Sequence, residues 1–84
     1  MKTYRAIIEV ELKPGTLDPQ GQALAGVLRD LGFRGVADVR VGKRIEVHLR
    51  AASAEEARQL VEAMCRRVLA NPVLEAYSYR VEAA

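Results

Sequence analysis

The sequence predicts an α+β domain of the ferredoxin-like βαββαβ type: a four-stranded antiparallel sheet with two helices on one face. Residues 3–12 alternate in polarity, which is typical of a strand. Two later segments have helical spacing and begin at capping residues, and three further apolar segments have strand length. The chain has 84 residues, so we expect a single domain over residues 1–84.

The first strand and the first helix are marked by a change of hydrophobic period. Every second side chain along residues 3–12 is apolar, as in a strand with one buried face. Asp18 and Pro19 then predict a helix over about 19–31. Asp18 can cap free backbone N–H groups, and Pro19 suits the first helical position. Gly32 stands where a helix commonly ends in a left-handed residue.

The middle of the chain predicts a hairpin. Residues 36–41 and 45–50 are two short apolar segments with strand composition. Between them, Gly42 and Lys43 indicate a tight turn. We therefore expect the second and third strands here, with Gly42 at the tip.

The second helix has a complete start signal. Ser53 and Glu56 form a capping box, in which each side chain can bond the backbone N–H of the other residue. The helix is expected over 54–70 and ends before Pro72, and a last strand follows over 73–82. Its predicted apolar face comprises Ala57, Leu60, Val61, Met64 and Val68.

One face of the predicted sheet has no helix to cover it. Apolar side chains are expected on that face, and an exposed apolar sheet face indicates a partner. We therefore expect a homodimer or a dimer of dimers, in which the open face packs on a second copy. The residues assigned to this face are Ile7, Val39 or Val41, and some of Tyr77, Tyr79 and Val81.

Composition excludes several classes of protein. The charge is balanced, 13 basic against 11 acidic residues, and nucleic-acid binders normally carry a clustered basic face. No apolar run approaches the roughly 18 residues of a membrane span. The single cysteine, Cys65, cannot form an internal disulfide or a zinc site, and we expect it to be buried as a small apolar side chain. The sequence thus predicts a cytoplasmic protein that contacts neither membrane nor nucleic acid.

The sequence shows no catalytic constellation and no set of metal ligands. The only histidine, His48, falls on the outward phase of a strand and has no nucleophile paired with it. The best binding candidates are three cations around the predicted hairpin, Arg40, Lys43 and Arg44, which suit phosphate or an acidic partner surface. The alternative is that they are solvated charges on an exposed turn.

Three segments of the chain stand out together. They are Leu17-Asp18-Pro19-Gln20-Gly21, Asp38-Val39-Arg40-Val41-Gly42-Lys43 and Leu69-Ala70-Asn71-Pro72-Val73-Leu74-Glu75-Ala76-Tyr77. With the strand end Val10–Lys13 and the pair Met64-Cys65, they resemble the PurS family, the small subunit of phosphoribosylformylglycinamidine synthase. The resemblance covers essentially the whole chain.

The resemblance implies a non-catalytic role in purine biosynthesis. In this family the large synthetase subunit uses ATP and Mg²⁺, and a glutaminase subunit releases ammonia. The small subunit helps to join them, so that ammonia converts formylglycinamide ribonucleotide to the amidine. It implies no cofactor bound by this chain alone. Two alternatives stay open: a ligand-binding regulatory domain of the same fold, revealed by stabilisation with an amino acid or nucleotide, and a weak RNA-binding module, revealed by salt-dependent RNA binding.

Overall fold

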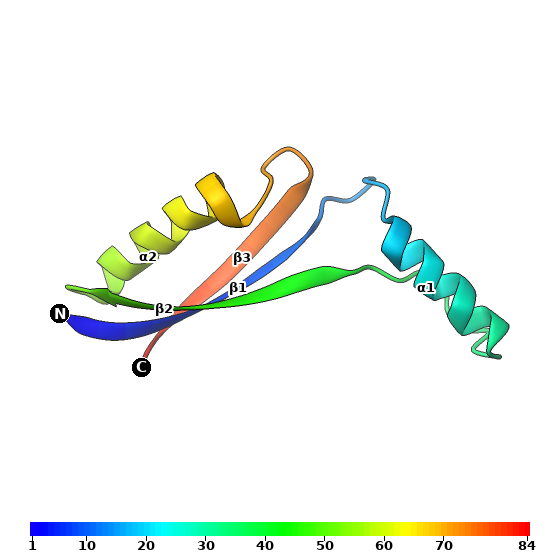
Figure 1. Ribbon diagram of the computed structural model, residues 1–84, viewed down its shortest axis with the longest axis horizontal. Coiled ribbons are helices and arrows are strands. Elements are labelled where there is room, and N and C mark those ends of the chain that lie inside the picture. Colours follow the sequence, from blue (N-terminus) through cyan, green and yellow to red (C-terminus); the bar gives the residue numbers. More distant parts are fainter.

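The computed structural model describes residues 1–84 (Figure 1). Two helices and three strands alternate along the chain, and the second helix ends in one π-helical turn, η1. The order is β1 (Lys2–Leu12), α1 (Pro19–Asp30), β2 (Gly42–Ala51), α2 (Ala54–Met64), η1 (Cys65–Leu69) and β3 (Glu75–Ala83). The predicted α+β class is confirmed, together with the positions of both helices.

The sheet has three antiparallel strands in the order β2-β1-β3, with β1 in the centre. The strand predicted over residues 36–41, the second of the four expected, is absent, because this segment leaves the sheet and runs back along α1. Arg29 of α1 donates to the carbonyls of Val36 and Ala37 at 3.0 and 2.9 Å. Without a strand on one side there is also no hairpin, and Gly42 is instead the first residue of β2.

The core lies between the sheet and α2. Ile8 and Val10 of β1 are completely buried against Val61 and Cys65. Ser53 caps α2 by accepting a hydrogen bond from the N–H of Glu56, whose carboxylate accepts from the N–H of the residue before Ser53. This half of the molecule therefore has the layered packing that the alternating and helical patterns predict.

α1 stands apart from the sheet (Figure 1). Its ends are nevertheless sharply defined. Asp18 accepts from the N–H of Gly21, and Gly32 ends the helix at φ +101° with the bonds of a Schellman motif. The radius of gyration is 16.6 Å, whereas a compact chain of this length has about 12 Å. The prediction that both helices cover one sheet face is therefore wrong within a single chain.

The sheet face opposite α2 is charged rather than apolar. Ile7 lies at its centre but is only 3% exposed, since long charged side chains surround it. Arg5 pairs with Glu82 at 2.7 Å on one side of β1. The side chains of Tyr77, Tyr79 and Val81 pack against the core on the α2 side instead. This face does not provide the apolar surface that was expected to bind a second copy.

Candidate functional site

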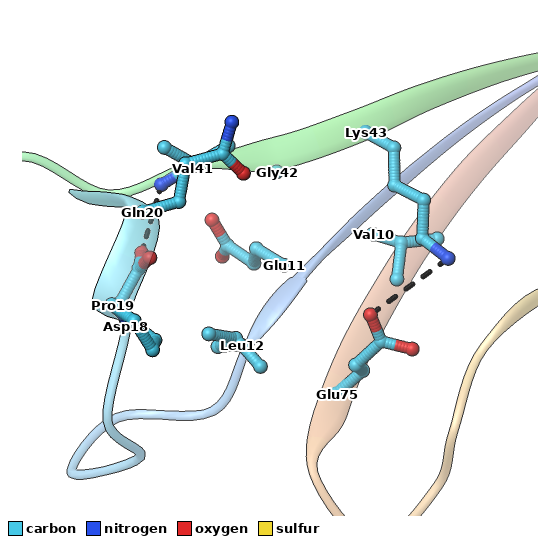
Figure 2. Close-up of a pocket in the computed structure, with 10 residues that line it drawn as sticks. All are labelled: Val10, Glu11, Leu12, Asp18, Pro19, Gln20, Val41, Gly42, Lys43 and Glu75. Atoms are coloured by element: carbon cyan, nitrogen blue, oxygen red, sulfur yellow. Dashed lines mark hydrogen bonds and ion pairs between the residues drawn. The ribbon is translucent and has the colours of Figure 1, made fainter. Parts of the chain in front are cut away.

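An open groove of about 630 Å³ lies where α1 joins the sheet (Figure 2). The end of β1, the start of α1 and the starts of β2 and β3 meet there. Its walls are apolar at Val10, Leu12 and Val41, while its polar groups include Glu11 and Lys43. Three strand ends and the start of a helix thus converge on this groove.

Asp18 organises the root of α1. One carboxylate oxygen accepts from the N–H of Gly21 at 2.8 Å and caps the helix, and the other accepts from the N–H of Val41 at 2.9 Å. The bond from Val41, followed by that from Gly21, holds the pKa of Asp18 below its usual value. One side chain thus ties the beginning of α1 to the segment that returns from its far end.

Two glycines permit the close approach of backbones at this root. A Cβ atom on Gly21 would lie 2.1 Å from the carbonyl oxygen of Val39. A Cβ atom on Gly42 would lie 2.7 Å from the carbonyl oxygen of Val10. Both positions therefore exclude any side chain, whereas sequence reasoning interpreted Gly42 only as a turn residue.

The three predicted cations do not form one cluster. Arg40 donates to the carbonyls of Leu12 and Lys13 at 2.9 and 3.3 Å, and so fastens the returning segment to the end of β1. Lys43 and Arg44 are neighbours on a strand and point to opposite faces of the sheet.

Each of the two strand cations has its own carboxylate. Lys43 lies 3.9 Å from Glu75, and Arg44 lies 3.5 Å from Glu46. Both cations are more than half exposed, at 55% for Lys43 and 57% for Arg44, and ion pairs of exposed side chains contribute little to stability. Both cations can therefore exchange their present carboxylate for one on a partner at small cost.

A second polar cluster joins α2 to β3. The hydroxyls of Tyr77 and Tyr79 both donate to the carboxylate of Glu62, and the two rings stack with centroids 6.4 Å apart. The bond to Glu62 raises the pKa of Tyr77 to about 12. Sequence reasoning missed this cluster, although alternate tyrosines on the inward phase of a strand facing a helical glutamate could have indicated it.

The remaining candidates have ordinary surroundings. Cys65 is buried, as predicted, and burial raises the pKa of its thiol. His48 is exposed and lies 2.8 Å from Glu46. No group of three or more potential metal-ligating side chains comes together, and neither helix is long and apolar enough to cross a bilayer.

These features define a small α+β protein with a three-stranded antiparallel sheet and a helix that projects from it. The family model for phosphoribosylformylglycinamidine (FGAM) synthase, PurS, matches residues 5–83. The PurS subunit from Synechocystis is 42% identical over 81 residues, covering 96% of this chain and 81% of its own.

Solved structures agree with this match. Thermus thermophilus PurS superposes with a TM-score of 0.84 at 44% identity and covers 98% of both chains. A chain of the PurLQS structure from Thermotoga maritima gives a TM-score of 0.88 at 32% identity, covering 98% of this chain and 100% of that one. The chain belongs to the PurS family, whose members are subunits of phosphoribosylformylglycinamidine synthase in purine biosynthesis. The family predicted from the three segments is confirmed.

Proposed function

We propose that this chain is a non-catalytic assembly subunit of the synthase, joining a large synthetase subunit to a glutaminase subunit. In this role it lets glutamine-derived ammonia reach the ATP- and Mg²⁺-dependent synthetase. The observation that carries the proposal is α1, a well-capped helix with exposed apolar side chains that packs neither on the sheet nor on α2. The likeness to a chain of PurLQS supports a role within a complex.

The first partner is a second copy of this chain. α1 exposes Leu24 and Val27, the C-cap residue Leu31 is exposed beside them, and exposed apolar side chains of this kind indicate a partner. A part of the sheet that α2 leaves uncovered, on the same side as α2, is the surface that could bind these side chains. The C-terminal half of α2 is tied to β3 through Glu62, which leaves Ile45 and other inward side chains of β2 half-exposed.

In a homodimer that exchanges α1, the helix of each copy would cover the exposed part of β2 in the other copy. The 12 residues of α1 span about 18 Å, which suits the length of the exposed part of β2. Each sheet would then carry two helices, as the ferredoxin-like prediction expects, with one helix contributed by the other copy. A stable dimer of this kind buries on the order of 1,200 Å² or more in total.

Sedimentation velocity tests the dimer. The double variant Val27→Asp/Leu31→Asp places two charges on the exposed side of α1 and should sediment as a monomer at micromolar concentration, where the native chain is a dimer. Gln22→Asp, also on an exposed position of α1, is the control that should leave the dimer intact. A native chain that is monomeric at that concentration would refute the exchange.

We further propose that Lys43 and Arg44 contact the large subunit or lie near its phosphorylated substrate. Arg40 belongs to the same predicted set, but Arg40→Ala would also release the end of β1. The cleaner test is Lys43→Ala/Arg44→Ala, which should weaken binding to the synthetase subunit and leave folding unchanged. Unaltered binding would exclude these two side chains from the interface.

Reconstitution tests the function as a whole. The synthetase and glutaminase subunits are mixed with ATP, Mg²⁺, the ribonucleotide and glutamine, and amidine formation is followed with and without this chain. Glutamine-driven turnover should need the chain, while a high ammonia concentration should bypass that need. If glutamine-driven turnover proceeds equally well without the chain, the assembly role is wrong.

A further inference from the structure

Asp18 is the only charged side chain that the structure buries, with 7% of its surface exposed. It lies where α1 joins the sheet, and the residues on either side of it, Leu17 and Pro19, are both exposed. Taking a carboxylate out of water costs free energy unless hydrogen bonds and a cation compensate for the lost hydration. The groups that compensate Asp18 come from separate segments of the chain, which makes it a connecting residue as well as a helix cap.

The carboxylate of Asp18 joins the start of α1 to the segment that returns from its far end. One oxygen accepts from the N–H of Gly21 in the first turn of α1, and the other accepts from the N–H of Val41, directly before β2 (Figure 2). The Nε atom of Arg40 lies 3.9 Å from the same carboxylate. The guanidinium group of Arg40 also donates to the last carbonyl of β1 and to the next one. We call Asp18 and Arg40 the arm latch, because together they connect α1, β1 and the start of β2.

The segment that the arm latch holds has a second partner available. Residues 36–41 have strand composition, and the outer edge of β2 is unpaired because β2 is an edge strand. Pairing at this edge, with α1 folded onto the α2 side of its own sheet, would give the closed ferredoxin-like domain that the sequence predicts. One chain therefore has two arrangements, a closed one and the extended one that the structure shows.

The contacts between α1 and residues 36–41 oppose closing. In a closed chain the helix and this segment would lie in different layers, whereas here their backbones touch at Gly21 and Val39. Arg29 holds the far end of the segment by donating to two of its carbonyls. Asp18 holds the near end, and only there do the contacts continue through Arg40 to the sheet. The arm latch is therefore the group that sets the direction of α1 relative to the sheet.

We propose that the arm latch holds α1 in the extended position from which it can exchange with a second copy, and that without the latch the chain closes on itself as a monomer. This inference rests on the α1 exchange in the proposed function. A hydrogen bond from a backbone N–H to a buried carboxylate is stronger than one between neutral groups. Losing the bond from Val41 should therefore shift the equilibrium between the two arrangements by about tenfold or more.

Asp18→Ser separates the latch from the helix cap. Serine caps helices about as well as aspartate, but its single oxygen cannot serve both Gly21 and Val41. Circular dichroism and hydrogen exchange should show that α1 stays helical. Sedimentation velocity should show a dimer dissociation constant raised by about tenfold or more. X-ray scattering should give the released monomer a radius of gyration near about 12 Å, against 16.6 Å for the extended chain.

Two further variants sharpen the test. Asp38→Ser makes the same substitution at an exposed carboxylate whose hydrogen bond is only to the N–H of the next residue, so it should leave the dimer unchanged. Arg40→Met keeps the apolar stem and removes the donors, and it should weaken the dimer as Asp18→Ser does. Because the two residues act as one latch, the double variant should lose little more than the larger single loss. Fully additive losses would contradict a single latch.

The outcomes for the latch and for the exchange are separate. The latch is overturned if Asp18→Ser dimerises as tightly as the native chain, or if its monomer stays as extended as the structure. A native chain that is monomeric at micromolar concentration would instead refute the exchange of α1. In that case the radius of gyration alone decides for the latch: it must stay near 16.6 Å in the native chain and fall in Asp18→Ser.

Discussion

The two helices of this molecule both have clear capping signals, but α2 is packed on the sheet and α1 is largely exposed. On one side, α2 lies over the three-stranded sheet and buries residues such as Ile8 and Val61 completely. On the other side, α1 is capped at both ends, yet Leu31 at its tip is 70% exposed. Only 13 of the 84 residues are buried, fewer than a compact domain of this length would have.

The difference shows that a helix can be fully specified without a place to pack in its own chain. Asp18, Gly32 and Arg29 define the start, the end and the return path of α1 through local hydrogen bonds. These contacts bury little apolar area beyond Ala25, so α1 has much less packing within the chain than α2 has. The stability of the other half comes from its own core.

The largest expected effect separates the two halves directly. Ile8→Ala leaves a cavity under α2 and should cost about 2–5 kcal/mol of unfolding free energy, a large share of the total for so small a chain. Val27→Ala removes a comparable side chain from α1. Its effect should stay within about 0.5 kcal/mol when urea unfolding is followed in dilute monomer. Equal losses for both variants would mean that α1 packs within its own chain.

A second comparison lies within α1 itself. Gly21→Ala would force a Cβ against the carbonyl of Val39 and should destabilise the root of the helix by about 1–3 kcal/mol. Gly26→Ala meets nothing within 4 Å and should stabilise the helix by about 1 kcal/mol. Hydrogen exchange of the α1 amides measures both changes. Faster exchange in Gly21→Ala and slower exchange in Gly26→Ala are expected, and the same direction in both would contradict the close contact at Val39.

The sequence predicted the elements that local signals define. The caps at Asp18 and Ser53, the alternation of β1 and the left-handed Gly32 are encoded within a few residues of where they act. These signals placed both helices and three strands within a few residues of their observed bounds.

The sequence could not predict how the halves meet. Residues 36–41 have strand composition, but Arg29 and Asp18 hold their backbone beside α1, away from the sheet. Arg40 was singled out for a partner's charge, whereas within the chain it bonds carbonyls at the end of β1, 27 and 28 residues away, and lies 3.9 Å from the Asp18 carboxylate. Val68 has the spacing of a buried residue but is 80% exposed, and only the π-helical turn η1 places it outside. In each case a non-local contact overrides a correct local pattern.

The smallest expected effect concerns how α2 is held, and it depends on pH. The Tyr77 hydroxyl donates to Glu62, which keeps the phenol protonated in the folded state up to a pKa of about 12, against an ordinary value of 10.0. Between these values the unfolded chain releases this proton and the folded chain retains it, so stability falls as pH rises.

The melting temperature of the native chain should therefore drop more steeply above about pH 10 than that of Tyr77→Phe, which has no such proton. Below pH 9 the variant should be slightly less stable, because Glu62 has lost one donor. Parallel curves across pH 8–11 would show that the Tyr77–Glu62 bond does not fasten α2 to β3, and that apolar packing alone distinguishes this half from α1.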